Sequence, residues 1–330
     1  MVNQHHESYL HAVARTALTR WEIAQDAALK LISLSENGMF LVTSGADKWV
    51  LRVHREGYHT KNGVRSELAW MKALRAEAGV ETPIAVEASD GDLIQSISAS
   101  PNEPSRMVVL FDFIAGSEPK TGDLHVAFRH LGSIAARMHR HARSWKRPAW
   151  FERQRWDYEG TFGPAPNWGH WRDGFAHVKG GFDIVDKADS LMQERLSRFG
   201  KAASRFGLIH SDLRLANLLV ADGETKVLDF DDSGFGWYLY DVASSLTFLE
   251  NDPDVDALIA SWVDGYATVG TLSPEEIDAI PTLMMFRRLV LMGWAGSHPS
   301  TDLAREMGED FTVGTVQLAR KYLATCGVPT

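Results

Sequence analysis

The sequence has few of the features that mark secreted, membrane-spanning or nucleic-acid-binding proteins. Its 330 residues include a single cysteine, Cys326, so no intramolecular disulfide can form, and a reducing cytoplasm is the expected location. No segment approaches the roughly 20 consecutive apolar residues of a membrane span, and the first 21 residues lack the apolar core of a signal peptide. The 43 acidic residues outnumber 34 basic ones, which argues against nucleic acid or an anionic membrane as the main partner. What remains is a soluble globular protein with 45% hydrophobic residues.

The chain also lacks a glycine-rich loop of the kind that covers nucleotide phosphates. Strands are predicted at 29–34, 39–43 and 48–54, and the first turn between them is Ser35-Glu36-Asn37-Gly38, in which Gly38 is the only glycine. Small or polar residues in such a turn let backbone amides approach a phosphate. Taken alone, however, the turn is typical of an ordinary hairpin.

The most informative stretch runs from residue 208 to residue 241. Three short runs rich in Leu, Ile and Val, at 207–210, 217–220 and 225–230, are predicted strands because turn residues bound them. Strand pairing brings strand ends together, so we expect four polar residues to gather at one edge of a small sheet: His210, Asp212, Asn217 and Asp229.

The spacing His210-x-Asp212-x4-Asn217, with Asp229 twelve residues further on, is typical of the catalytic loop and metal-binding aspartate of eukaryotic-type kinases. An ionised carboxylate can accept the proton of a hydroxyl during phosphoryl transfer, which is the role predicted for Asp212. Mg²⁺ prefers oxygen ligands and keeps several waters, so Asn217 and Asp229 suffice as its protein ligands beside nucleotide phosphates. His210 is expected to support the loop. Aspartate and asparagine also favour turns, but three sites at this spacing between apolar strands favour the kinase interpretation.

This segment resembles the Brenner-type motif of the aminoglycoside phosphotransferase and choline kinase superfamily. Its longer form, GLIHSDLRLANLLV followed by VLDFDDSGFGWYLYDVA, is similar to the homoserine kinase and stress-response kinase branch. Ser211 stands where the family has glycine. Arg214 stands where protein serine/threonine kinases carry a lysine near the transferred phosphate, and Asp241 resembles the aspartate that fixes the catalytic loop. The resemblance implies an α+β fold of two lobes, like that of protein kinases, with ATP and Mg²⁺ in the cleft between them.

The same resemblance assigns nucleotide-binding roles to residues before the catalytic stretch. Asn37 and Gly38 would lie over the phosphates, since Glu36-Asn37 is similar to the Glu-Asn of homoserine kinase-like sequences. Arg52 occupies the position of the strand lysine that holds the α and β phosphates, and it keeps the positive charge with a planar fork of donors. Glu67, in a helix predicted over 62–78, is its expected partner, with a solvated helical carboxylate as the alternative.

The stretch DFIAG is the expected connector between the lobes. In this fold the connector offers a backbone carbonyl and a backbone amide to adenine, and we assign these roles to Asp112 and Ile114, with Phe111 behind the base. The N-terminal lobe is therefore predicted over 1–111, the hinge over 112–116 and the C-terminal lobe over 117–330. The predicted elements are a helix at 7–21, strands at 92–98 and 106–111 that complete a five-stranded sheet, and C-terminal helices at 123–143, 174–199, 242–250, 253–266, 274–294 and 302–324.

Three other groups of residues have weaker signals. Residues 150–171 are predicted to form an irregular loop. Its tryptophans either pack inside the protein or contact substrate, and the sequence favours neither alternative. Four histidines within 123–143 are expected on a helix surface, because they lack the spacing of a metal site. The acidic run from Glu250 to Asp256 fits a helix start, with attraction of an ammonium group as the weaker alternative.

Three functions stay open at this point. The first is an ATP- and Mg²⁺-dependent kinase that phosphorylates a hydroxyl of a small molecule, with an amino alcohol or an amino acid such as homoserine as the nearest guess. The second is a protein serine/threonine kinase of the stress-response type. The third is a nucleotide-binding pseudokinase, which the intact Asp212, Asn217 and Asp229 argue against, while Arg52 and the sparse glycine loop keep it open. The sequence does not indicate the oligomeric state.

Overall fold

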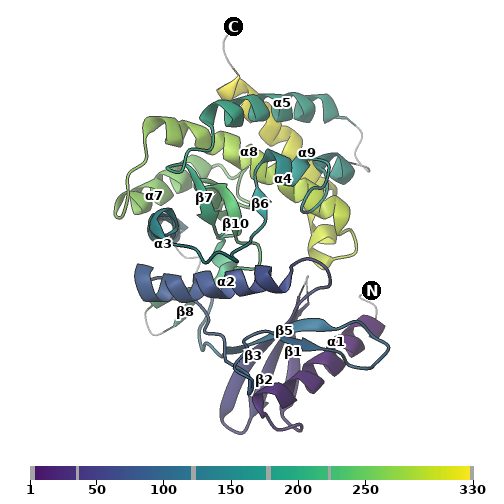
Figure 1. The fold of residues 1–330 in the computed structure, drawn as a ribbon. Coiled ribbons are helices and arrows are strands. Elements are labelled where there is room, and N and C mark those ends of the chain that lie inside the picture. The colour runs from purple at the N-terminus through teal and green to yellow at the C-terminus, as the bar shows by residue number, and fades with distance from the viewer. Residues whose placement is uncertain (1–3, 35–36, 120–123, 176–179, 222–223, 328–330) are drawn as a thin grey trace.

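The protein folds into two lobes in the computed structural model, which describes residues 4–34, 37–119, 124–175, 180–221 and 224–327. A twisted sheet with one helix on its outer side forms the first lobe, a mostly helical body forms the second, and helix α2 lies between them (Figure 1). The elements of the first lobe are α1 (Gln4–Ala17), η1 (Leu18–Trp21), β1 (Ala28–Leu34), β2 (Gly38–Ser44), β3 (Asp47–Val53), α2 (Lys61–Ala73), η2 (Leu74–Ala78), β4 (Gln95–Ile97) and β5 (Arg106–Asp112).

The sheet of the first lobe is antiparallel, with five strands in the order β1-β2-β3-β5-β4. Side chains alternate between its faces because successive residues of a strand point in opposite directions. On β5, Val108 and Leu110 join the cluster under α1, whereas Val109 and Phe111 join the core that contains α2. The prediction of five strands with one helix is confirmed.

Helix α2 begins at an N-cap, where the hydroxyl of Thr60 accepts a hydrogen bond from the amide of Gly63. The helix continues into a single π turn, η2, and ends at Gly79, whose φ of 60° is in the left-handed region. The predicted helix over 62–78 is therefore confirmed.

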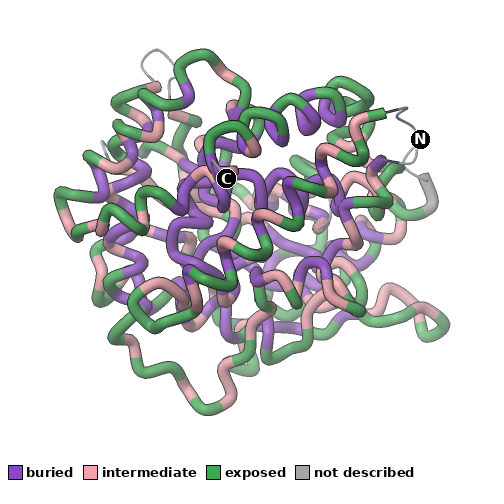
Figure 2. Tube along the Cα trace, turned by 90° about the horizontal axis from the view of Figure 1, so that it is seen from above, coloured by how far each residue is buried: buried purple, intermediate pink, exposed green. Residues whose placement is uncertain are grey.

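The second lobe has a large core of aromatic and aliphatic side chains, and Figure 2 shows buried chain through the middle of the molecule with exposed segments around it. Its elements are α3 (Leu124–Ser144), β6 (Arg155–Trp156), α4 (Tyr158–Phe162), η3 (Trp171–Phe175), α5 (Phe182–Phe199), β7 (Phe206–Ile209), η4 (Leu215–Asn217), β8 (Leu218–Ala221), β9 (Glu224–Val227), β10 (Gly234–Trp237), α6 (Tyr240–Ser245), α7 (Val255–Ala267), α8 (Pro274–Ser297) and α9 (Asp302–Cys326).

The three strands predicted between 207 and 230 do not form one sheet. β8 pairs with β9, while β7 pairs with β10, which also pairs with β6. β10 escaped the prediction because two of its four residues are glycines. Both are needed, since a Cβ atom on Gly234 would lie 2.5 Å from the carbonyl oxygen of Gln154, and one on Gly236 would lie 2.5 Å from Ile209.

Several weaker predictions are also corrected. The segment 150–171 is not wholly irregular, because it contains β6 and α4. His139 and His141 are buried, whereas His125 and His130 are exposed as expected. Cys326 is buried in α9. Residues 35, 36, 123 and 176–179, which carry parts of a predicted turn and of two predicted helices, lie outside the described residues.

Candidate active site

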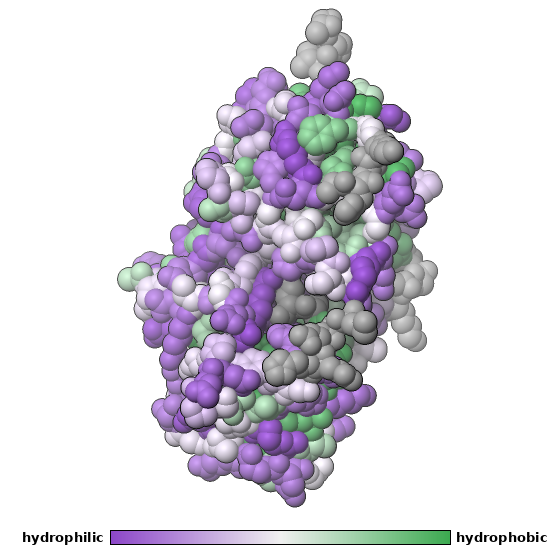
Figure 3. Space-filling model, turned by 90° about the vertical axis from the view of Figure 1, so that its right-hand side faces the viewer, coloured by the Kyte–Doolittle hydropathy of each residue, from purple (hydrophilic) through white to green (hydrophobic). Residues whose placement is uncertain are grey.

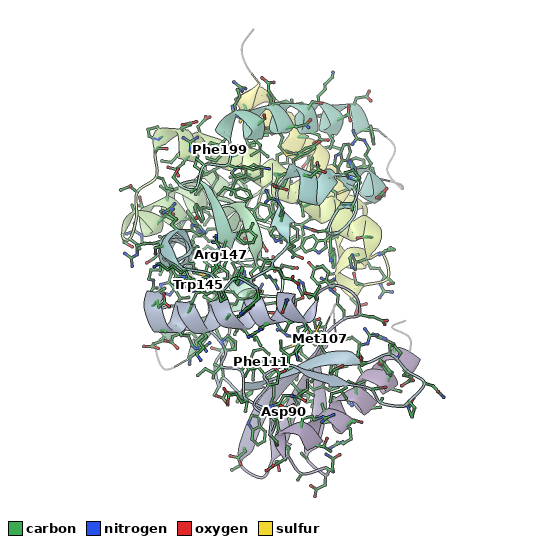
Figure 4. All side chains as sticks on the ribbon, viewed as in Figure 1. Asp90, Met107, Phe111, Trp145, Arg147 and Phe199 are labelled. Atoms are coloured by element: carbon green, nitrogen blue, oxygen red, sulfur yellow. The ribbon has the colours of Figure 1, made fainter. Side chains whose placement is uncertain are left out.

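A cavity of about 380 Å³ lies between the two lobes. Figure 4 labels Phe111, one of its lining residues, on β5 where the sheet faces α2. The cavity is within the size range of small-molecule sites. The predicted site residues that line it are Asn37, Arg52, Glu67, Asp112, Ile114, Asn217 and Asp229; Gly38, Asp212 and Arg214 are not part of its lining. Gly38 packs instead against Phe40 and Leu10.

Arg52 and Glu67 form a buried, two-pronged ion pair at the back of this cavity. The two N–H···O distances are 2.8 and 2.9 Å, and the residues are 5% and 1% exposed. Burial opposes the charge of Arg52, but the carboxylates of Glu67 and Asp231 outweigh it and raise the pKa of the guanidinium. The prediction of this pair is confirmed, and a solvated helical carboxylate at Glu67 is wrong.

Asp212 lies in the loop between β7 and η4, and cationic and amide donors surround its carboxylate. Its Oδ2 atom accepts from Nδ2 of Asn217 at 2.8 Å and from Nε of Arg214 at 3.2 Å. Its Oδ1 atom accepts from the guanidinium of Arg287 at 2.6 Å. Burial alone would raise the pKa of Asp212, but Arg214 and Arg287 lower it below its ordinary value, so the carboxylate stays ionised.

Arg287 is a residue that the sequence motifs did not reveal. It lies in the middle of α8, in a run where all residues from Thr282 to Gly293 are buried. A charge in such a run has to be paired, because a lone buried charge is costly. The presence of two arginines within a long apolar helix is therefore the sequence signal that could have indicated Arg287 and its neighbour Arg288. This signal does not indicate which residues pair with them.

The backbone of the catalytic loop is fixed by Asp241. Its carboxylate accepts from the amides of His210 and Ser211, at 3.2 and 2.8 Å, and from Nε2 of His139 at 2.9 Å. Ser211 has a φ of 70°, the left-handed conformation that favours glycine. The ring of His210 is buried and contacts the carbonyl oxygen of Leu228 at 2.9 Å, so this histidine supports the loop as expected.

Asn217 and Asp229, the two predicted metal ligands, both line the cavity. Nδ2 of Asn217 donates to Asp212, so the amide oxygen of the same group is the atom that can ligate a metal. Burial and the nearby carboxylates of Asp231 and Asp212 raise the pKa of Asp229 to about 7. A surplus of negative charge of this kind fits a divalent cation. Within the described residues, no group of three or more His, Cys, Asp or Glu side chains is arranged as a metal site, so nucleotide and water oxygens would complete the shell.

Asp231 is a second buried carboxylate that was not predicted, and it joins the two lobes. Its Oδ2 atom accepts from Nδ2 of Asn37 at 3.0 Å, and its carbonyl oxygen lies 2.8 Å from Nε2 of His59. Burial opposes ionisation, but His59 and Arg52 hold the pKa of Asp231 well below its usual range. The other end of the Asn37 amide accepts from the backbone of Arg55 at 3.0 Å. Asn37, which precedes β2, therefore lines the cavity and also links the segment after β3 to the segment after Asp229.

Aromatic residues from both lobes lie around Asp232, which is one of the residues that line the cavity. The hydroxyl of Tyr58 donates to Asp232 at 2.5 Å and accepts from the indole of Trp168 at 3.1 Å. The guanidinium of Arg287 lies 5.7 Å from the ring centroid of Trp168 and 5.7 Å from that of Tyr240. Segment 150–171 thus reaches the surroundings of Asp212 through Trp168.

Another charged stretch of the sequence is the acidic run from Glu250 to Asp256. Glu250 is buried and pairs with Arg288 at 2.9 Å, so the acidic run after it does not form one surface patch. Hydrophilic side chains cover most of the face in Figure 3, with smaller hydrophobic areas between them. No helix in the described part of the chain is long and apolar enough to span a membrane.

Comparisons with known proteins agree with this architecture. A microcompartment-associated aminopropanol kinase of known structure is 37% identical, with 96% of this chain and 98% of that chain covered and a TM-score of 0.88. The amicoumacin kinase of Bacillus subtilis (strain 168) is 22% identical over 298 residues, which are 85% of this chain and 83% of that protein. The structure of amicoumacin kinase hAmiN with AMP-PNP and Ca²⁺ shares the fold, with a TM-score of 0.77 at 18% identity and with 98% of this chain and 96% of that chain covered.

These likenesses confirm the predicted two-lobed α+β fold and the resemblance to the aminoglycoside phosphotransferase and choline kinase superfamily. Residues 29–277, which include the cavity and the whole catalytic loop, match the model of the phosphotransferase enzyme family. The chain therefore belongs to the phosphotransferase enzyme family and is a phosphotransferase with an alcohol group as acceptor.

Proposed function

We propose that the protein is an ATP- and Mg²⁺-dependent kinase that phosphorylates the hydroxyl of a small amino alcohol. The observation that carries this proposal is the position of Asp212, whose ionised carboxylate lies beside Asn217 at the edge of the nucleotide-sized cavity. The 37% identity with an aminopropanol kinase over nearly the whole of both chains supports an amino alcohol of that size as the acceptor. Homoserine, a hydroxylated amino acid, is retained as the second candidate of the same class.

The cavity suits a purine nucleotide at its hinge side. We propose 112–116 as the hinge between an N-terminal lobe of residues 1–111 and a C-terminal lobe of residues 117–330. The amide of Asp112 already donates to the carbonyl oxygen of Ile84 at 2.9 Å. The groups left to recognise adenine are therefore the carbonyl of Asp112 and the amide of Ile114, and Phe111 lies in the same wall.

The phosphates would extend from there toward Arg52 and the catalytic loop. Arg52 would contact the α or β phosphate, and Arg214 would lie near the transferred group. Mg²⁺ bound by Asn217 and Asp229 would neutralise phosphate charge and align the γ phosphate. Asp212 would orient the acceptor hydroxyl and take its proton as the oxygen bonds to phosphorus.

The proposal is tested by measuring ADP release from Mg-ATP with a panel of acceptors. The panel contains aminopropanol, ethanolamine and homoserine, the matched amine propylamine that has no hydroxyl, and a serine-rich protein substrate. We expect turnover with a hydroxylated amine and none above background with propylamine, and the Asp212→Asn variant should remove it. Phosphorylation of the protein substrate alone would favour a protein kinase, and binding of nucleotide without transfer to any acceptor would favour a pseudokinase.

A further inference from the structure

Arg287 approaches the catalytic loop from an element outside the motif that contains Asp212. It lies on α8, is 2% exposed, and donates through one terminal nitrogen to Oδ1 of Asp212 at 2.6 Å. Its other donors reach the hydroxyl of Tyr240 at 3.3 Å and that of Thr247 at 3.4 Å. The guanidinium is therefore held at three points and cannot swing freely.

The hydrogen bonds of Asp212 divide unequally between its two oxygens. Oδ2 receives two donors, from Asn217 and Arg214, whereas Oδ1 receives the single donor of Arg287. Each carboxylate oxygen has about two acceptor sites. Among the contacts of the described residues, Oδ1 is thus the oxygen that can accept one more hydrogen bond.

We propose that Arg287 is a positioning residue of the acceptor site, which holds Asp212 so that Oδ1 receives the acceptor hydroxyl; this inference rests on the proposed kinase function. The hydroxyl proton passes to Oδ1 as the acceptor oxygen forms a bond to the γ phosphorus. The bond between that phosphorus and the bridging oxygen of ATP breaks, and ADP leaves with the electron pair. Arg287 acts through its hydrogen bond to Oδ1 rather than on the acceptor or the phosphates, and its effect is to keep Oδ1 facing the acceptor.

The adjacent residue offers a matched control. Arg288 is 4% exposed and pairs with Glu250 at 2.9 Å, so it has the same charge, helix and type of partner. Its other donors reach the hydroxyl of Thr315 and the carbonyl oxygen of Phe311, on α9. Loss of either arginine removes an ion-pair partner from a buried carboxylate and lowers stability, but of the two arginines only Arg287 contacts Asp212.

The experiment compares Arg287→Met, Arg287→Lys and Arg288→Met with the parent protein. With Arg287→Met, we expect kcat for the acceptor to fall by about 10²-fold, the effect of misplacing a reacting group by about 1 Å, while KM for Mg-ATP changes little. Arg287→Lys should recover part of the rate, and added guanidinium should partly rescue Arg287→Met. Arg288→Met should keep kcat within about twofold of the parent despite its lower stability.

Two results would overturn the inference: a kcat for Arg287→Met equal to that of Arg288→Met, or a crystal structure of Arg287→Met in which the Asp212 carboxylate keeps its orientation. The crystal structure needs no acceptor. If the parent protein phosphorylates no acceptor at all, the proposed function fails, and the orientation of Asp212 still decides the role of Arg287. A rotated carboxylate in Arg287→Met, with an unchanged one in Arg288→Met, supports it.

Discussion

Arg52 and Arg287 each pair with a buried carboxylate, one beside the proposed nucleotide cavity and one beside the proposed acceptor site, but they hold it differently. Arg52 binds both oxygens of Glu67, whereas Arg287 binds one oxygen of Asp212. A two-pronged pair fixes the planar guanidinium in one orientation, ready for a third partner. A one-point pair fixes the carboxylate and leaves it able to accept. In the proposed nucleotide half the arginine would be the group presented to the ligand, and in the proposed acceptor half it would be the carboxylate.

The largest effect is expected in the acceptor half. Asp212→Asn keeps the shape of the side chain but removes the negative charge and the proton acceptor, so turnover should fall by about 10² or more. The affinity for Mg-ATP should stay nearly the same, because Asp212 is not part of the cavity lining. Kinetics with the true acceptor and nucleotide titration test both statements. Unimpaired turnover would show that the acceptor half does not depend on this carboxylate.

The boundary between the halves is tested at the two expected metal ligands. Asp229→Ala should weaken Mg-dependent nucleotide binding more than Asn217→Ala, since a carboxylate contributes a charge as well as an oxygen. Asn217→Ala should lower turnover in addition, because it removes a donor to Oδ2 of Asp212. Calorimetry of Mg-ATP binding gives the ranking. Equal affinities for the parent protein and Asp229→Ala would contradict the assignment of the metal site.

In the nucleotide half, Arg52→Ala should weaken ATP binding by on the order of 1.5–3 kcal/mol, the range for a charge-assisted hydrogen bond. Arg52→Lys should recover only part of this, because lysine lacks the planar fork. The small loss typical of an exposed surface ion pair is not expected here, because Arg52 is buried. Since Glu67 would be left unpaired, Glu67→Gln combined with Arg52→Ala is the control for lost stability. Binding as tight as in the parent protein would remove the phosphate role from Arg52.

Asp229 and Asp212 differ in protonation, because the pKa of Asp229 is raised and that of Asp212 is lowered. The raised pKa makes the free energy of unfolding depend on pH. Asp229 has a pKa of about 7 against an ordinary value of 3.8. Between these values the native protein holds a proton that the unfolded chain has lost, so the free energy of unfolding decreases as pH rises. One such proton contributes at most about 1.4 kcal/mol per pH unit.

Unfolding without metal, followed from about pH 5 to about pH 7.5, measures this effect as the difference between the parent protein and Asp229→Asn. The parent should lose stability relative to the variant as pH rises, and added Mg²⁺ with nucleotide should reduce the loss. Parallel pH profiles for the two proteins would contradict the raised pKa.

Local patterns were sufficient to predict the strands and helix of the first lobe and the loop that contains Asp212. The five strands of the first lobe, the helix with Glu67 and the loop with Asp212 each have a signal within a few residues of sequence, in alternation, helical period or motif spacing. Such signals involve residues that are close together in the chain, so a single sequence is enough to detect them. The Arg52–Glu67 pair was predicted from the resemblance to kinases, in which a cation on a strand is followed by a glutamate on a helix.

The acceptor half could not be predicted in the same way because tertiary packing assembles it. Arg287 is 75 residues from Asp212 in the chain, and Tyr58 is 174 residues from Asp232. The sequence signals that buried arginines need partners but not which carboxylates they find. Likewise, the two glycines of β10 weaken the strand pattern in the sequence, although they allow the folded strand to make close contacts with β7 and Gln154. By contrast, the motif alone is enough to identify Ser211, which stands where the family has glycine.

That position, Ser211, gives the smallest expected effect. Its φ of 70° is costly for a residue with a Cβ atom, by about 1–2 kcal/mol, and its hydroxyl donates to the carbonyl oxygen of Asp232 at 2.6 Å. This hydrogen bond, worth about 0.5–1.5 kcal/mol, offsets much of the strain and ties the acceptor loop to the segment after Asp229.

Ser211→Ala keeps the strain and loses the bond, so its unfolding free energy should drop by about 1 kcal/mol. Ser211→Gly loses the bond but also the strain, and it should be the more stable of the two variants, with turnover near that of the parent protein. Chemical denaturation of the three proteins tests the order. A Ser211→Ala variant as stable as the parent would show that the hydroxyl does not hold the loop, and a Ser211→Gly variant below Ser211→Ala would show that the left-handed backbone carries no strain.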